Sequence, residues 1–283
     1  MEEDVLELEQ PAPFALDRPP LVQALTQVQF PQIARLSTLA GVADIQDALL
    51  DSFPYMQQVD VQELQVAFGP GGVNPQATAN KVTHFKTDDG WSFELSAGAA
   101  ALTATPSAYK SARTFAERLR QGLVALSTVP GLSRCTRLGV RYVNIAPVFA
   151  SSTEWTDWFK PELLGWARPG LLAPDTELAA MITETRTNSR MGGSLAWASK
   201  IEGVIRHGYA PKGSVLPLSQ PQPLDETSFI LDLDLFVTEH QPWDAEVLVE
   251  QYIALHSQIE TFFYWTLTDK GKEVFGYREE SNG

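Results

Sequence analysis

Residues 228–237 read SFILDLDLFV, and this regular alternation of apolar and acidic residues predicts a β-strand. In a strand the leucines share one face, and Asp232 and Asp234 lie on the other. Residues 244–268 follow with an aspartate that can cap a helix and apolar residues at helical spacing. A strand with one polar face and a long amphipathic helix are typical of an antiparallel sheet covered by helices.

The same order of elements occurs twice along the chain. A strand over 21–30, a short helix over 45–53, further strands and a long helix ending at Val129 make up the first half. The second half begins with LGVRYVNIA at 138–146 and ends with the helix at 244–268. We therefore expect an α+β fold of two pseudo-repeated halves, each an antiparallel sheet backed by one long helix, without residue-level identity between them.

The expected organisation has three parts. Residues 1–18 are acidic and interrupted by two prolines, which predicts a disordered tail. Residues 19–135 form the first α+β half and residues 136–283 the second, packed together as one compact unit. Residues 69–76 hold two prolines and three glycines, which indicates a loop.

Composition excludes several classes of protein. The chain has 283 residues, of which 44% are hydrophobic and 20% charged, as in an ordinary globular protein. No apolar run approaches the roughly 18 residues that a membrane span needs, and the acidic start is unlike a leader peptide. A single cysteine, Cys135, fits a reducing compartment. The sequence therefore predicts a cytoplasmic protein without a membrane association.

Negative charge is concentrated in two regions. The formal net charge is −14, and 15 of the 35 acids lie in residues 1–10 and 213–269. Such regions favour a protein partner with a basic surface and make direct nucleic-acid binding unfavourable. The alternative is that the charge serves solubility alone. A homo-oligomer is also compatible with this pattern.

Arginine in an apolar strand is the first candidate for a site. Arg141 lies in LGVRYVN beside Tyr142 and Asn144, and a buried unpaired charge is costly. One interpretation makes Arg141, Tyr142, Asn144 and Glu184 a ligand-binding set in which the guanidinium holds a carboxylate or phosphate. The other pairs Arg141 with an acid of a neighbouring strand, either Glu184 or Asp232.

Asp232 and Asp234 are the candidate metal ligands. Two carboxylates about 7 Å apart on one strand face could bind a hard divalent cation. The alternative is an ordinary strand with one solvated face. The four histidines are scattered, and no nucleophile elbow, phosphate-binding loop or dinucleotide fingerprint is present. We therefore assign no catalytic residue and no cofactor. The sequence leaves open whether the protein is an enzyme, and it favours a protein without catalytic activity.

Three tryptophans are concentrated near the start of the second half. Trp155, Trp158 and Trp166 lie in a predicted surface connection. Exposed tryptophans often mark partner-binding surfaces, which makes these three candidates for protein–protein interaction. The alternative is that they fill the space between the two predicted sheets.

Three stretches resemble a known family. They are PPLVQALTQVQFP at 19–31, LGVRYVNIAP at 138–147 and LHSQIETFFYWTLTDKGKEVFG at 255–276. They are similar to the opening strand, the central G-[LV]-R-Y-[IV]-N strand and the closing helix of a sporadically distributed prokaryotic family of unknown function. The proline-rich segment 212–227 departs from that pattern. The resemblance implies a full-length domain and no known catalytic residues.

Two functions follow from these observations. The first is a non-enzymatic interaction protein, the acidic component of a mobile antiviral defence or toxin–antitoxin-type module. Its mobility is implied only by the patchy distribution of the family that the chain resembles. The alternative is a ligand-binding or metal-dependent enzyme domain with a site between the halves, formed by Arg141, Glu184, Asp232 and Asp234.

Overall fold

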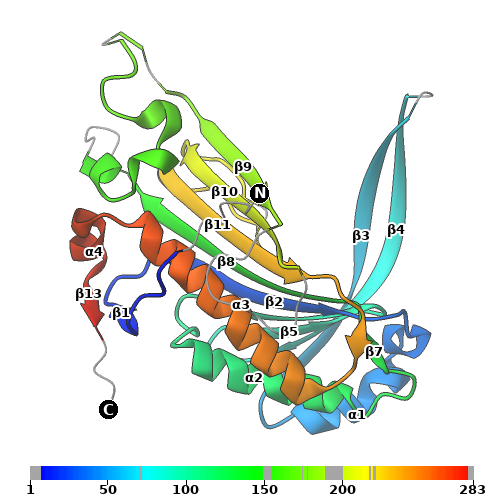
Figure 1. Ribbon diagram of the computed structural model, residues 1–283. Coiled ribbons are helices and arrows are strands. Elements are labelled where there is room, and N and C mark those ends of the chain that lie inside the picture. The colour runs from blue at the N-terminus through cyan, green and yellow to red at the C-terminus, as the bar shows by residue number, and fades with distance from the viewer. Residues whose placement is uncertain are drawn as a thin grey trace, which may run out of the picture. The chain divides into compact units, whose positions relative to one another are not determined.

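The computed structural model shows an α+β protein dominated by one large antiparallel sheet (Figure 1). It describes residues 8–69, 72–148, 154–173, 175–176, 178–188, 200–216, 218 and 221–279. Within these ranges the α-helices are α1 (Leu39–Leu49), α2 (Ala112–Leu126), α3 (Ala245–Thr266) and α4 (Asp269–Phe275). None of them combines the length and apolar character that crossing a lipid bilayer requires.

The large sheet has nine strands in the order β3-β4-β5-β6-β2-β8-β11-β10-β9. Their bounds are β2 Leu21–Gln29, β3 Tyr55–Gly69, β4 Gly72–Lys86, β5 Trp91–Leu95, β6 Ala99–Ala104, β8 Arg137–Pro147, β9 Met181–Thr187, β10 Glu202–Ala210 and β11 Ser228–Val237. The α+β class is therefore confirmed. The expectation of a separate sheet for each half is wrong, because β2 and β8 are hydrogen-bonded neighbours in one sheet.

Contacts divide the chain into two units. The first contains residues 1–24, 139–237 and 254–283, and the second contains residues 25–138 and 238–253. Each unit is assembled from segments that are distant in sequence. The predicted division at residues 135 and 136 stays a prediction.

The second unit has its core beneath α2. Ser111 caps this helix in a reciprocal capping box with Thr114. The apolar residues Phe115, Leu119 and Leu123 of α2 are buried, and the ring of Phe115 stacks on Tyr252 of α3 at 5.0 Å. Asp244 caps α3 as predicted, because its Oδ1 accepts hydrogen bonds from the two backbone amides that follow Ala245.

Two local expectations in this unit are wrong. The short helix predicted for 45–53 is α1 over 39–49, because Thr38 caps it by accepting a hydrogen bond from the Gly41 amide. The loop predicted for 69–76 is largely part of a hairpin, since β3 and β4 pair as far as Gly69 and Gly72. The ladder leaves only residues 70–71 between its strands, and these lie outside the described residues.

The first unit has its core between α3 and the sheet. The three leucines of β11 are 1% exposed, and the ring of Tyr142 lies 5.3 Å from His256 of α3. Burial of one face of β11 against α3 explains why Leu231, Leu233 and Leu235 alternate with Asp232 and Asp234 in the sequence. The opposite face of β8 and β11 carries Arg141 and Asp232.

The beginning of the chain is partly ordered, contrary to the expected tail over residues 1–18. Strand β1 (Phe14–Leu16) pairs with β13 (Tyr277–Glu279) near the end of the chain. The ring of Phe14 lies 5.5 Å from Tyr264 and 5.4 Å from Tyr277, so aromatic contacts hold this segment in place. Residues 1–7 lie outside the described residues. A second short ladder joins β7 (Arg134–Cys135) to β12 (Gln241–Pro242).

Candidate functional site

Arg141 and Asp232 form a two-pronged ion pair on the sheet face opposite α3. Nε of Arg141 donates to Oδ1 of Asp232, and Nη2 donates to Oδ2, both at 2.8 Å. The side chains are 18% and 5% exposed. Burial lowers the pKa of Arg141, but the hydrogen bond and charge of Asp232 raise it above the usual value. The structure thus contains the Asp232 pairing that the sequence offered as one alternative.

The pair continues across two more strands. Arg206 of β10 lies directly opposite both Asp232 and Glu184 in the strand register. Its Nη1 donates to Asp232 at 3.3 Å and its Nε donates to Glu184 at 2.8 Å. Arg186 also donates to Glu184, at 3.0 Å, and these hydrogen bonds from Arg186 and Arg206 lower the pKa of Glu184. We call Arg141, Asp232, Arg206, Glu184 and Arg186 the charge ladder.

The charge ladder brings together only part of the predicted ligand set. Arg141 and Glu184 are connected through Asp232 and Arg206. Tyr142 is buried on the α3 face, and Asn144 donates from Nδ2 to a backbone carbonyl of β11 at 3.3 Å. These four residues therefore do not converge on one ligand, and their role in binding stays a prediction.

The predicted metal ligands are also engaged in the sheet. Both carboxylate oxygens of Asp232 accept hydrogen bonds from arginines. In the described part of the chain, no group of three acidic, histidine or cysteine side chains is arranged to hold a metal ion. A cation at Asp232 would have to displace a guanidinium from a buried site.

The three candidate tryptophans have different surroundings. Trp155 is 7% exposed and stacks on Tyr209 at 5.8 Å. Trp158 lies edge-on to Phe275 at 5.9 Å. Trp166 is 62% exposed. Of the three, only Trp166 has the exposure that a partner-binding residue needs, and its role in binding stays a prediction.

Cys135 is fully buried rather than poised for reaction. Burial raises the pKa of its thiol to about 11. Desolvation disfavours the thiolate, and this effect on the pKa outweighs the lowering by hydrogen bonds to the Arg137 backbone and the Gln241 side chain. The thiol donates to the Arg137 carbonyl at 3.4 Å, which is a structural role.

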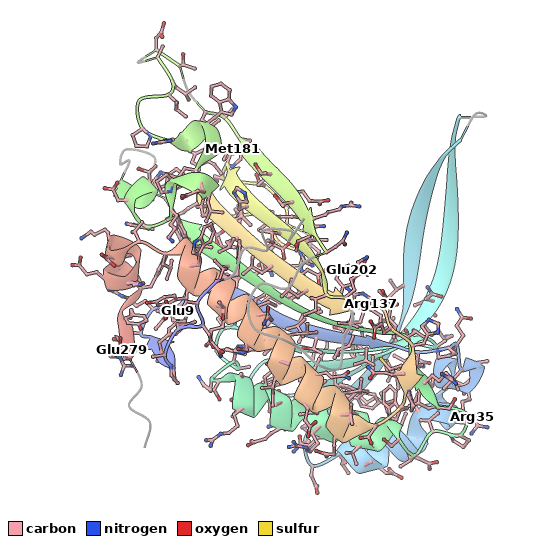
Figure 2. The ribbon with its side chains drawn as sticks, viewed as in Figure 1. Glu9, Arg35, Arg137, Met181, Glu202 and Glu279 are labelled. Carbon is pink, nitrogen blue, oxygen red and sulfur yellow. The ribbon has the colours of Figure 1, made fainter. Side chains whose placement is uncertain are left out.

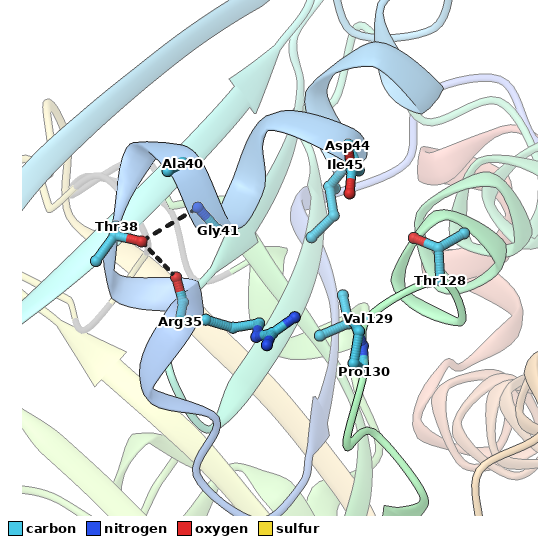
Figure 3. A pocket seen from close by; sticks show the side chains of 9 residues that line it. All are labelled: Arg35, Thr38, Ala40, Gly41, Asp44, Ile45, Thr128, Val129 and Pro130. Atoms are coloured by element: carbon cyan, nitrogen blue, oxygen red, sulfur yellow. Dashed lines mark hydrogen bonds between the residues drawn. The ribbon is translucent and has the colours of Figure 1, made fainter.

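A shallow cavity of about 310 Å³ lies at the start of α1 (Figure 3). Its walls come from the segment around α1 and from the chain after α2, and they include Arg35, Asp44 and Val129. Thr38 forms the rim, donating to the Arg35 carbonyl at 2.9 Å and accepting from the Gly41 amide at 3.1 Å. Among the described residues that line the cavity, Arg35 is the only one with a positive charge.

Replacing Thr38 with alanine tests the capping role of this rim. We expect Thr38→Ala to reduce the free energy of unfolding by about 1 kcal/mol, because the Gly41 amide loses its side-chain acceptor. Urea denaturation measures the change. Thr38→Ser retains the acceptor oxygen and should stay close to the parent protein. Equal losses for both variants would contradict the capping role.

A larger cavity, of about 490 Å³, lies in the first unit. Sequence reasoning missed it, because its residues come from three separate segments. Lys160 precedes η3 (Pro161–Leu163), Tyr264 and Trp265 end α3, and Lys272 lies on α4. Each lysine contacts an aromatic ring, with Nζ of Lys160 at 4.7 Å from the Trp265 centroid and Nζ of Lys272 at 3.9 Å from that of Tyr264.

The family resemblance rests on the three short sequence stretches alone. Their residues have structural roles in this fold: 19–31 and 138–147 include β2 and β8, and 255–276 spans the end of α3 and α4. Comparison of the chain with family models, curated proteins and solved structures finds no match.

Proposed function

We propose that this chain is a non-enzymatic interaction protein that associates with a second copy of itself through the hairpin of β3 and β4. The supporting observation is the length of this hairpin relative to its neighbour. β3 and β4 pair over fifteen positions each, whereas β5 pairs with β4 only from Thr83 to Lys86. The two strands extend past the end of β5 (Figure 1). We call residues 61–80 the arm.

An isolated two-stranded ribbon is only marginally stable in water. The register of the arm pairs Leu64 with Ala77 and Phe68 with Val73, while Gln65 pairs with Gln76. Positions of apolar type therefore alternate with polar ones along both strands, which is the pattern of a ribbon with one face to be covered. Among the described residues, the paired arm strands have no third strand beside them. We therefore expect a partner protein to supply the apolar contacts that the paired arm strands lack.

Charge favours a second copy as that partner. The arm contains a single charged residue, Glu63, although the chain as a whole carries −14. A basic protein would gain little from a segment with a single charged residue, whereas an identical arm has the same apolar sequence pattern and can pair with two-fold symmetry.

Shortening the arm tests the proposal. Residues 62–79 are replaced by Asn-Gly, so that Val61 and Asn80, which are paired in the register, flank a two-residue turn. We expect the parent chain to sediment as a dimer and the shortened chain as a monomer. The thermal midpoint should be retained once the concentration dependence of the dimer is taken into account.

Point variants provide the matched control. Phe68→Ser should weaken dimerisation about tenfold, which corresponds to ~1.4 kcal/mol. Gln65→Ser, on the same strand at a position of polar type, should leave it unchanged. Analytical ultracentrifugation across a concentration series measures both. A parent chain that stays monomeric throughout, or a shortened chain that still dimerises, would refute the role of the arm.

Binding of a partner with a basic surface, which the acidic sequence predicts, is also part of the proposed function. The net charge of −14 supports a partner with a basic surface, as in the component of a mobile defence module. Ion pairs reduce the number of carboxylates that such a partner could contact, because Glu246 binds Arg120 at 2.9 Å and Asp232 belongs to the charge ladder. Asp225, Glu226 and Glu250 remain exposed.

We also propose that the two halves share an origin by internal duplication. The strand order supports this: β2 is followed outward by β6, β5, β4 and β3, and β8 is followed outward by β11, β10 and β9, so the first series has one strand more than the second. A long helix, α2 or α3, follows the last strand of each series along the chain, with only a two-residue strand, β12, before α3. The matching order would explain why the two halves have the same sequence pattern without shared residues.

A further inference from the structure

Strand β9 forms one edge of the large sheet (Figure 1). It pairs with β10 from Met181 to Thr187, and among the described residues no strand lies on its other side. Met181, where the strand begins, is labelled in Figure 2. Residues 182–186 are all exposed, so both faces of the strand are accessible there. An edge strand of this kind presents a row of backbone N–H and C=O groups with which a further strand can pair.

The sequence of β9 lacks the residues that usually protect an edge strand. MITETRT contains no proline, glycine or lysine, and its isoleucine and three threonines are β-branched residues that favour strands. Its two charged side chains bind one another, because Nε of Arg186 donates to Glu184 at 3.0 Å. They therefore do not repel an incoming strand as two like charges would. The edge is suited to β-augmentation, in which an extended peptide adds a strand to a sheet.

Charge at this edge selects the kind of strand that fits. Glu184 is shared between two arginines, because both Arg186 and Arg206 donate to it. The charge ladder has three arginines and two carboxylates, and Arg186 is its most exposed side chain, at 81%. A strand that places a carboxylate opposite Arg186 would gain a charge-assisted contact across the strands.

We propose that β9 binds an extended segment of a partner protein, which pairs with it in the antiparallel direction and places an acidic residue opposite Arg186. A second copy of this chain fits less well. Antiparallel pairing of two β9 strands about Thr185 would bring Glu184 of each copy opposite Arg186 of the other. Each copy, however, adds two arginines, Arg186 and Arg206, for its one Glu184. A partner strand with an acid and no base supplies the carboxylate that a second copy does not.

A fluorescently labelled peptide, acetyl-Thr-Glu-Val-Thr-Val-Thr-amide, tests the inference. Its glutamate lies opposite Arg186 when the peptide runs antiparallel to residues 182–187. Fluorescence anisotropy measures its binding to the full-length chain. Replacing the peptide's glutamate with glutamine should weaken binding about tenfold, the loss of one charge-assisted contact. The chain carries a net charge of −14, so long-range attraction would favour the glutamine peptide, and a preference for glutamate has to arise locally.

Variants of the chain identify the residue that selects the acid. Arg186→Gln should weaken binding of the glutamate peptide about tenfold and leave binding of the glutamine peptide unchanged, because the two groups act as one pair. Arg278→Gln is the matched control, since it removes an exposed arginine of the same unit that lies on β13. It should leave the binding of both peptides unchanged. Circular dichroism verifies that each variant is folded.

N-methylation of the peptide distinguishes strand pairing from a side-chain contact alone. A strand pairs with one neighbour through the N–H groups of alternate residues. Methylating one alternate set of amides should therefore abolish binding, and methylating the other set should preserve it. Equal effects of the two sets, equal binding of the glutamate and glutamine peptides, or no binding of the glutamate peptide would overturn the inference.

The arm-shortened chain separates this inference from self-association through the arm. It should bind the peptide as the parent chain does, because β9 and the arm belong to different units. Failure of the arm to dimerise would leave peptide binding intact, and failure of peptide binding would leave the arm dimer intact. An arm-shortened chain that dimerises and becomes monomeric on Arg186→Gln would identify a second copy as the occupant of β9 and refute the partner strand.

Discussion

Replacing Asp232 with alanine is expected to lower the free energy of unfolding by about 3–5 kcal/mol, because it leaves a largely buried guanidinium without its carboxylate. Arg141 would lose both of its 2.8 Å hydrogen bonds, and Arg206 would lose one of its two acidic partners. Urea denaturation monitored by tryptophan fluorescence measures the change. Glu184→Ala should cost much less, because Glu184 lies in the exposed part of the charge ladder.

A paired substitution distinguishes a structural ion pair from a ligand anchor. Arg141→Met combined with Asp232→Leu removes both charges, and apolar replacement of a buried pair is often neutral or stabilising. We expect the double variant to recover most of the stability lost in Asp232→Ala. A loss below about 1 kcal/mol in Asp232→Ala would show that the pair is dispensable for folding, and it would return Arg141 to the candidates for ligand binding.

Acidification is expected to destabilise the protein between pH 6.5 and about 4, through His256. Burial of His256, which lies on α3 against the ring of Tyr142, lowers its pKa from 6.5 to about 4. In that window the unfolded chain binds a proton at this site and the folded chain does not, so stability falls as the pH falls. At ~1.4 kcal/mol per pH unit the loss amounts to about 3 kcal/mol, and it is complete below the folded-state pKa.

Measuring the unfolding free energy across this pH range tests the assignment. His256→Phe should flatten the slope, because it removes the titrating group and retains a ring near Tyr142. His207 is also buried, and its lowered pKa adds a contribution of the same sign. His240→Gln, at an exposed position, is the matched control for loss of a histidine. A slope that His256→Phe leaves unchanged would contradict the role of His256.

Strong periodicity made much of the fold predictable. β8, β11 and α2 have one face buried by a neighbouring element, so their apolar residues recur at the period of the strand or helix. The hairpin of β3 and β4 was missed because Pro and Gly residues at 69–76 resemble a loop, whereas only residues 70–71 lie between the paired strands. Propensity records the local preference of each residue and carries no information about how far a ladder continues.

The site residues were predictable to a smaller extent. Asp232 was one of two acids expected to pair with Arg141, because both lie on predicted neighbouring strands and a buried charge requires compensation. The role of Arg206 could not be predicted from the sequence, because its ion pairs with Asp232 and Glu184 depend on the strand register. The lysines of the larger cavity are 112 positions apart in sequence, between Lys160 and Lys272, and no local pattern relates them.

The pairing of β1 with β13 has a mechanical consequence. Phe14 lies opposite Glu279, so the chain enters and leaves this ladder at the same end. A force that pulls the residues before Phe14 away from those after Glu279 would therefore load the hydrogen bonds one pair at a time. In a single-molecule stretching experiment, these strands should peel apart at low force before the large sheet bears any load.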